Sequence, residues 1–209
     1  MAFADEAAPV AVLEYQPQWP VDFDRLAVKL YDALGGEAHT IDHIGSTSVP
    51  GLAAKDCVDV QVRVAEIEEA RQTGLLAAIG FRCRPEPWNR AELSGGQECG
   101  KLVLAPPVGA RRCNVHLRRE YDPNCRFALL FRDYLRADEA ARQQWGEFKR
   151  RLAHSVPDLL DYGRIKAPAT EILMVAAERW AAATGWRPPP GRPAPRTAPA
   201  TRADFDGTR

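Results

Sequence analysis

The most constraining feature of this chain is a run of seven residues, Val58–Val64, in which valine occupies every second position. Such alternation of β-branched and polar residues predicts a strand with one buried face. Side chains two residues apart on a strand point the same way, so Asp59 and Gln61 should lie side by side on its polar face. The chain therefore needs a sheet whose apolar face is covered and whose polar face is available for chemistry.

A second strand and a glycine turn come just before this run. Residues Ile41–Ile44 supply the first strand, Gly45 and Ser46 end it, and Pro50–Gly51 is a strong turn signal. A Gly-Ser turn leaves backbone N–H groups free to face an anion, and glycine lets a phosphate approach closely. The carboxylate of Asp59 is a hard oxygen ligand suited to a Mg²⁺ ion that carries phosphates. This layout is that of nucleotidyltransferases of the polymerase-β kind.

A longer motif is more specific. The stretch from His43 to Lys55 reads His-Ile-Gly-Ser-Thr-Ser-Val-Pro-Gly-Leu-Ala-Ala-Lys. It closely resembles the signature of the GrpB family (the UPF0157 group), H-I-G-S-T-[SA]-V-P-G-L-x-A-K. The resemblance extends from Tyr15 to Trp186. It includes the Tyr-x-Pro-x-Trp-Pro opening, Asn114-Val-His-Leu-Arg118, Phe131-Arg-Asp-Tyr-Leu-Arg136 and Ala177-Glu-Arg-Trp180.

The resemblance implies a fold and a metabolic setting, but it names no reaction. The implied fold class is α+β (mixed α/β): a nucleotidyltransferase-like mixed or antiparallel sheet flanked by helices, with a helical C-terminal half. Domains that resemble this one also occur fused to dephospho-coenzyme A kinases, which implies a link to nucleotide or coenzyme A metabolism. This chain has no Walker loop and is not itself expected to be that kinase.

The order of elements follows from periodicity and turn signals. We expect one domain over residues 10–186, followed by a disordered proline-rich tail over 187–209. The predicted strands cover residues 10–14, 41–44, 58–64, 81–83, 101–105 and 112–118, with the last two joined as an antiparallel hairpin. The predicted helices cover residues 23–34, 65–79, 122–135, 137–154 and 168–184, with a short helix or turn at 159–166. Residues 85–100 are predicted to form a loop.

The predicted polar face carries fewer carboxylates than two-metal catalysis requires. Nucleotidyl transfer of the polymerase-β kind employs two metal ions held by several carboxylates. Here Gln61 is neutral, and the polar face of the next strand offers Asn114, His116 and Arg118 instead of an acid. Two interpretations stay open. In one, Asp59 binds Mg²⁺ and acts with His116 in catalysis; in the other, a degenerate site binds a nucleotide or phosphate without turnover.

The remaining candidates are ligand-binding residues. Besides Gly45 and Ser46, the substrate- or phosphate-binding candidates are Thr47, His43, Lys55, Gln61, Arg118 and Lys166. His43 either faces the phosphate site or anchors the turn through a hydrogen bond. Lys55 and Lys166 either neutralise a triphosphate or lie in solvent. For Arg132, an ion pair with the adjacent Asp133 is favoured over contact with an anion.

Composition excludes several classes of function. Lysine and arginine (28) balance aspartate and glutamate (28), which gives no support for broad binding to nucleic acid or to a membrane surface. The five cysteines are scattered without Cys-x-x-Cys spacing, which argues against a zinc site or a disulfide framework. No apolar run is long enough to span a bilayer, and the first residues lack the pattern of a signal peptide. We therefore expect a cytoplasmic protein whose partner is a nucleotide or phosphorylated small molecule.

Overall fold

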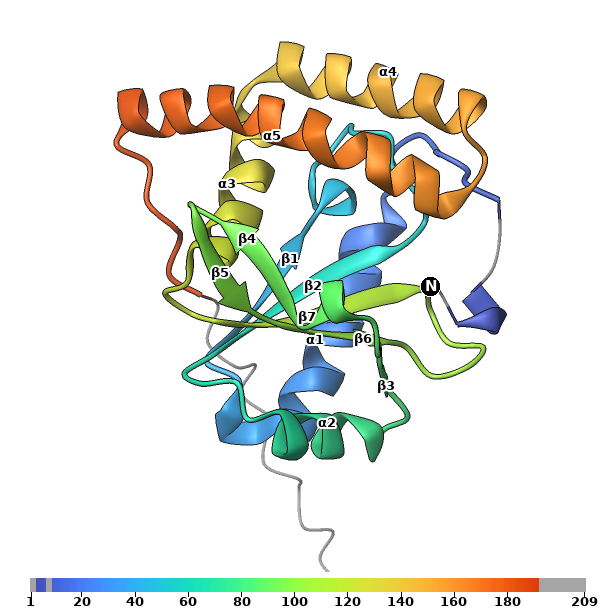
Figure 1. Ribbon diagram of the computed structural model, residues 1–209, viewed down its shortest axis with the longest axis vertical. Helices are drawn as coiled ribbons and strands as arrows, with labels where there is room; N and C mark the ends of the chain where they lie inside the picture. Colours follow the sequence, from blue (N-terminus) through green and yellow to red (C-terminus); the bar gives the residue numbers. More distant parts are fainter. Residues whose placement is uncertain (1–2, 7–8, 192–209) are drawn as a thin grey trace, which may run out of the picture.

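The computed structural model describes residues 3–6 and 9–191, in which helices cover both faces of a mixed sheet (Figure 1). The α-helices are α1 (Gln18–Leu34), α2 (Glu69–Ala77), α3 (Pro123–Ala137), α4 (Glu139–Ser155) and α5 (Leu159–Thr184). The strands are β1 (Thr40–Ile44), β2 (Val58–Val64), β3 (Arg82–Cys83), β4 (Ala91–Ser94), β5 (Gln97–Gly100), β6 (Leu102–Ala105) and β7 (Cys113–Arg119). Short 3₁₀ turns are η1 (Ala4–Glu6), η2 (Gly35–Glu37), η3 (Ser46–Ser48) and η4 (Pro87–Asn89).

The main sheet has the strand order β1-β2-β7-β6-β3. Strand β2 runs antiparallel to β1 and parallel to β7, and β6 runs antiparallel to β7. In this register Asp59 lies beside Ile44 on one side and beside Asn114 on the other. The mixed sheet flanked by helices is therefore confirmed, and so is the antiparallel pairing of β6 with β7.

One face of the sheet is the apolar core. The four valines of β2 are each exposed by 1% or less and pack in one cluster with Trp19 and Leu30 of α1. Burial of a valine side chain contributes roughly 1.5–3 kcal/mol relative to leaving it exposed, so this face anchors the fold. Helix α1 ends at Gly35, whose φ of 54° lies in the region that glycine tolerates best. The opposite face of β2 carries its polar residues toward α3.

The C-terminal half forms a second core, and its helices α4 and α5 lie above the sheet in Figure 1. Leu130 and Leu135 of α3, Trp145 of α4, and Met174 and Ala177 of α5 are buried in it. The prediction of a helical C-terminal half is confirmed. No helix in the described part of the chain combines the length and hydrophobicity that a membrane crossing requires.

The loop predicted for residues 85–100 is wrong. Strands β4 and β5 pair as a separate two-stranded antiparallel sheet, and Gly95 and Gly96 turn between them with φ of 58° and 78°. Two consecutive glycines suit such a turn because both central positions need positive φ. The hairpin lies over the start of α3, where Asn124 Nδ2 donates to the carbonyl of Gly100 at 3.2 Å. This hairpin becomes one wall of the site described below.

Three other boundaries differ from the prediction. Helix α5 is continuous through Pro168. Its N-cap residue is Asp158, whose carboxylate accepts hydrogen bonds from two backbone N–H groups. The expected edge strand at 10–14 is only an isolated bridge between Leu13 and Ala54. Helix α2 is shorter than residues 65–79. Most of the predicted tail, residues 192–209, lies outside the described residues.

Candidate functional site

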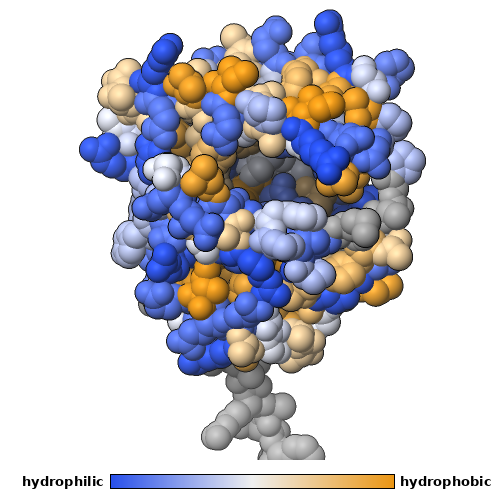
Figure 2. All heavy atoms as spheres, in the orientation of Figure 1, coloured by the Kyte–Doolittle hydropathy of each residue, from blue (hydrophilic) through white to orange (hydrophobic). Residues whose placement is uncertain are grey.

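A cavity of about 300 Å³ lies between the polar face of the sheet, the β4–β5 hairpin and helices α3 and α5. Figure 2 shows this face of the molecule hollowed below α5. The lining residues are Ile44, Gly45, Asp59, Glu92, Leu93, Ser94, Asn114, His116, Arg118, Asn124, Phe127, Ala128, Phe131, Lys166, Thr170 and Glu171. Charged side chains of both signs stand among apolar and aromatic ones, so the cavity wall is mixed in character.

Gly45 and Asp59 fit against one another at one end of this cavity. The φ and ψ of Gly45 are 67° and −170°, a conformation that residues with a side chain rarely adopt. A Cβ atom at this position would overlap the carboxylate of Asp59 and lie 3.0 Å from its Cβ. The absence of a side chain at position 45 therefore gives the Asp59 carboxylate its place in the cavity wall.

The Asp59 carboxylate has a small set of polar neighbours. Asn114 Nδ2 donates to its Oδ1 at 2.9 Å, and His116 Nε2 lies 3.8 Å from the same oxygen. Burial alone would raise the pKa of Asp59, but His116, the Asn114 hydrogen bond and the charge of Lys55 hold it below its ordinary value. Burial lowers the pKa of His116 although Asp59 opposes this. At neutral pH the site thus pairs an ionised carboxylate with a neutral imidazole.

Two lysines near Asp59 rest on aromatic rings. The ammonium of Lys166 lies 6.0 Å from the ring centre of Trp145, and that of Lys55 lies 5.4 Å from the ring centre of Tyr162. Ring faces attract cations but leave their N–H groups free for a further acceptor. Lys166 lines the cavity, whereas Lys55 is half-buried and is not among the lining residues.

A third lysine, which we did not predict from the sequence, lies close to these two. Lys149 is 2% exposed and donates to the carbonyl of Ala53. Burial lowers its pKa well below the ordinary value, and the charges of Lys166 and Lys55 lower it further, while Asp59 opposes the shift. Within the described residues no ion pair joins these three lysines to a carboxylate. Lys55 and Lys166 thus bring positive charge to the Asp59 end, while the burial of Lys149 disfavours its charged form.

Arg118 and Glu92 occupy the other end of the cavity. Arg118 Nε donates to Glu92 Oε1 at 3.0 Å, and Lys101 Nζ donates to Glu92 Oε2 at 2.6 Å. Burial would raise the pKa of Glu92, but the charges of Arg118 and Lys101 outweigh it and hold the pKa at about 2. Glu92 is therefore a fixed anion in the wall contributed by β4.

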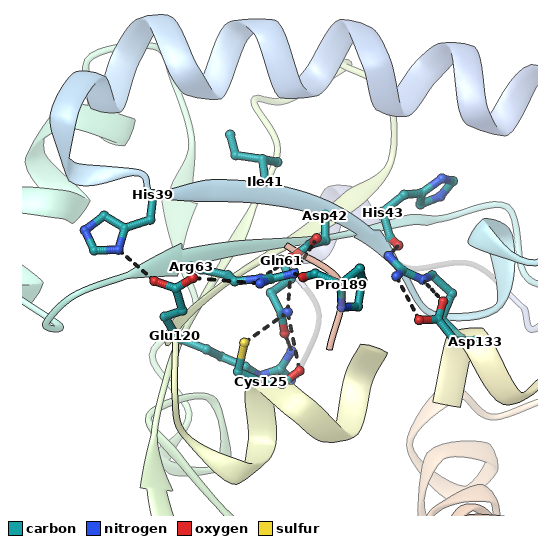
Figure 3. Close-up of polar contacts among 12 residues, drawn as sticks. His39, Ile41, Asp42, His43, Gln61, Arg63, Glu120, Cys125, Asp133 and Pro189 are labelled. Carbon is teal, nitrogen blue, oxygen red and sulfur yellow. Dashed lines mark hydrogen bonds and ion pairs between the residues drawn. The ribbon is translucent and has the colours of Figure 1, made fainter. Parts of the chain in front are cut away.

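Gln61 lies beneath the cavity and is not one of its lining residues. It is fully buried, and its Oε1 accepts from Arg118 Nη1 at 3.0 Å. Its Nε2 lies 3.4 Å from Asp42 Oδ2 and from the backbone oxygen of Cys125 (Figure 3). The structure thus places Gln61 as a support for Arg118, away from direct contact with a ligand.

His43 and Thr47 anchor the turn. The His43 ring stacks on Phe23 with centroids 4.7 Å apart, and its Nε2 lies 3.0 Å from Thr47 Oγ1. Burial lowers the pKa of His43 to about 4, so the ring is neutral at neutral pH. Neither residue lines the cavity, and neither does the half-buried Ser46. This arrangement matches the anchoring interpretation of His43.

The predicted site residues are therefore divided by the structure. Gly45, Asp59, His116, Arg118 and Lys166 line one cavity, although they come from three different elements and a turn. The ion pair expected between Arg132 and Asp133 is present at 2.7 Å and is confirmed. Arg132 also donates to the carbonyl of His43, so it holds β1 against α3.

Sequence reasoning missed Glu92, Asn124 and Lys149. The Gly95–Gly96 pair is a hairpin signal and could have placed Glu92 on a strand. Lys149 stands four residues after Trp145, inside the apolar stripe of its helix, and such a buried position for a lysine is itself a signal. For Asn124 we find no signal in the sequence.

The side chains that line the cavity suit one metal ion better than two. The described residues contain no cluster of three or more His, Cys, Asp or Glu side chains arranged to hold a metal ion. Three carboxylates line the cavity: Glu92 is already engaged by two cations and Glu171 is exposed on α5, which leaves Asp59 as the carboxylate beside the Gly45 turn. A single Mg²⁺ shared with ligand phosphates and water fits this set, since Mg²⁺ commonly takes one or two carboxylates plus substrate phosphates. A two-metal centre does not fit it.

Comparison with known proteins decides the family. The model of the GrpB protein family matches residues 9–174. The chain belongs to the GrpB family. The crystal structure of the conserved protein GrpB from Enterococcus faecalis superposes with a TM-score of 0.68 at 32% identity, covering 81% of this chain and 99% of that one.

Two relatives illustrate the contexts in which the GrpB sequence occurs. A UPF0157 protein of Streptomyces coelicolor is 37% identical over 78% of this chain and 81% of its own. A protein named dephospho-CoA kinase from Mycolicibacterium paratuberculosis is 33% identical, over 87% of this chain and 49% of that protein. The chain thus spans about half the length of the dephospho-CoA kinases that it matches.

Proposed function

We propose that this GrpB protein binds a nucleotide, or a related small phosphate ester, in the cavity over Asp59. The main support for this proposal is the position of the Asp59 carboxylate. It lies against Gly45 in the cavity wall, and Lys166 lines the same cavity. An ionised carboxylate beside lysines without ion-pair partners is suited to a metal ion that carries a phosphate. The metal ion would balance the charge of the carboxylate, and the phosphate would balance the charge of the lysines.

The phosphates would lie between Lys166 and the turn at Gly45. Lys166 has N–H groups that can donate to phosphate oxygens, and Lys55 adds positive potential behind it. A bound Mg²⁺ would neutralise phosphate charge and would take Asp59 as its protein ligand. Lys166 and Gly45 would orient the phosphate chain toward that carboxylate.

Nucleotidyl transfer is the reaction class that we propose for this site. An acceptor hydroxyl would attack the α-phosphorus of a nucleoside triphosphate, a new P–O bond would form, and pyrophosphate would leave. His116 is neutral and lies beside Asp59, so its imidazole can take the proton of that hydroxyl. Asp59 would stabilise the imidazolium that results.

A second candidate is a binding module without turnover. Gln61 favours it, because the position two residues after Asp59 carries a buried amide where two-metal enzymes use a carboxylate. The ligand would then be a nucleotide or a coenzyme A-related phosphate ester that is sensed without being converted. A link to coenzyme A metabolism is part of this proposal, as is the cytoplasmic location expected from the sequence.

Isothermal titration with ATP, dephospho-coenzyme A and inorganic phosphate, each with and without Mg²⁺, tests the proposal. The variants are Asp59→Asn and Lys166→Met, with Lys29→Met as a matched control on the exposed side of α1. We expect Mg²⁺-dependent binding of ATP to wild type and to the control, and losses of about tenfold or more in both cavity variants. Absence of binding by all three ligands would contradict the proposal.

Pyrophosphate release separates the two candidates. Incubation of the protein with radiolabelled ATP and small alcohols or amino alcohols should release pyrophosphate if transfer occurs, and His116→Gln should abolish that release while ATP still binds. Binding without release by wild type, over a panel of acceptors, would favour the binding module. Release that persists in Asp59→Asn would contradict the role given to that carboxylate.

A further inference from the structure

Two residues that line the same cavity carry buried polar atoms that have no hydrogen-bond partner among the described residues. Among the described residues four buried side-chain polar atoms lack a hydrogen bond, and two of them, Asn124 Oδ1 and His116 Nδ1, belong to residues that line this cavity. Buried polar groups are nearly always paired, and each exception needs an explanation. Two exceptions in one cavity indicate that a ligand supplies the missing partners.

Asn124 Oδ1 and its neighbour Glu92 are acceptors. Asn124 is 1% exposed, and its Nδ2 already donates to the Gly100 carbonyl, so its Oδ1 is the group left to pair. The carboxylate of Glu92 accepts one bond on each oxygen, from Arg118 and Lys101, and a carboxylate has capacity for about four. The Glu92 end of the cavity therefore offers acceptors to whatever enters it.

The two ends are joined along one strand. Asn114, His116 and Arg118 follow one another on the polar face of β7, with Asn114 bonded to Asp59 and Arg118 bonded to Glu92. Asn114 and Arg118 are four residues apart, roughly 13 Å along a strand. An extended nucleotide spans a comparable length from its phosphates to the edge of its base.

The wall contributed by α3 is aromatic at this place. Phe127 and Phe131 line the cavity one turn apart, on the same helix as Asn124. Aromatic side chains suit a flat ring because any nucleobase can stack against them through its π-face. A planar ring that carries an N–H donor matches both features, the acceptors and the aromatic wall.

We propose that the Asn124–Glu92 end of the cavity is a subsite for a nucleobase with an exocyclic amino group, such as the 6-amino group of adenine. This inference rests on the proposed function, because it takes the phosphates of the same ligand to lie at the Asp59 end. Asn124 Oδ1 accepts from the amino group, and Glu92 accepts a second N–H or O–H of the ligand. An analogue without the amino group leaves Asn124 Oδ1 buried and unpaired, which costs affinity.

The test compares ATP with purine riboside 5′-triphosphate, which lacks only the 6-amino group, by titration in Mg²⁺. We expect wild type to bind ATP at least tenfold more tightly than the analogue. Asn124→Leu should bring the two affinities within about twofold of each other, and Asn124→Asp, which keeps an acceptor oxygen, should preserve the preference. Gln72→Leu is the matched control, since Gln72 is also a 1% exposed amide but lies in α2, away from this cavity.

Equal affinities of wild type for ATP and the analogue would overturn the subsite while leaving the phosphate end intact. Binding of neither triphosphate would overturn the proposed function, and the subsite would fall with it. A preference for ATP that Asn124→Leu retains in full would also overturn the role of Asn124. The wild-type comparison stands even if Asn124→Leu fails to fold.

Discussion

Asp42 and Asp59 are carboxylates on neighbouring strands of one sheet, and they differ in how they are partnered. Asp42 on β1 accepts from Arg63 through both oxygens, at 2.7 and 2.9 Å, and Gln61 lies beside it (Figure 3). Asp59 on β2 accepts one hydrogen bond, from Asn114, and 30% of its side chain is exposed.

The difference separates stability from function on one face of the sheet. A buried carboxylate held by both N–H groups of a guanidinium fixes strands in register and is closed off from a ligand. A carboxylate with one donor and an open side can take a metal ion or a phosphate-bound cation. Changes at the Asp42 end should therefore cost folding free energy, and changes at the Asp59 end should cost ligand binding.

The largest expected effect is that of Arg63→Met. The substitution leaves Asp42 buried without its counter-charge, so the free energy of unfolding should fall by about 3–5 kcal/mol. Urea unfolding monitored by circular dichroism measures this. The double variant Asp42→Leu with Arg63→Met should recover most of the loss, because an apolar pair of similar volume has no unpaired charge. A cost below about 1 kcal/mol for Arg63→Met would contradict this account.

The next effect concerns pH. Folded His43 has a pKa of about 4, whereas the unfolded side chain titrates near 6.5. Between these values the unfolded state binds a proton that the folded state does not, so stability should decrease as pH falls from 6.5 to 4, by up to about 3 kcal/mol. The difference in unfolding free energy between wild type and His43→Gln, followed across this range, isolates the contribution. A difference that stays constant with pH would show that the pKa of His43 is the same in the folded and unfolded states.

The smallest expected effect is that of Asp59→Asn on the stability of the ligand-free protein. Asparagine keeps the shape and an acceptor for Asn114, so the free energy of unfolding should change by about 1 kcal/mol or less. The same urea experiment compares it directly with Arg63→Met. A loss as large as that of Arg63→Met would erase the distinction between the two carboxylates.

Local pattern was enough to predict one part of this site. The alternating valines of β2 and the Gly-Ser turn after β1 are signals within a few residues, and they are enough to predict that Gly45 lies near Asp59. The polar row of β7 was found in the same way, since strand alternation predicts which side chains share a face.

The remainder depends on contacts between distant segments. Glu92 and Asn124 reach the cavity because a short, exposed hairpin folds over the start of α3, and no periodicity in residues 85–100 indicates where that hairpin lies. Gln61 and His43 have the residue types of ligands, but burial by α1 and α3 makes them supports. Helix α5 passes through Pro168 because packing against α3 and α4 outweighs the local preference to break there.

The contact between Gly45 and Asp59 also sets an order in which these positions can change over evolutionary time. Any side chain at position 45 would overlap the Asp59 carboxylate, so the glycine is held in place as long as the aspartate is present. Exchange of Asp59 for a smaller residue removes that overlap and leaves only the backbone conformation to favour glycine. Loss of the carboxylate should thus precede loss of the glycine, and a GrpB lineage that abandons this site would pass through chains that keep Gly45 without Asp59.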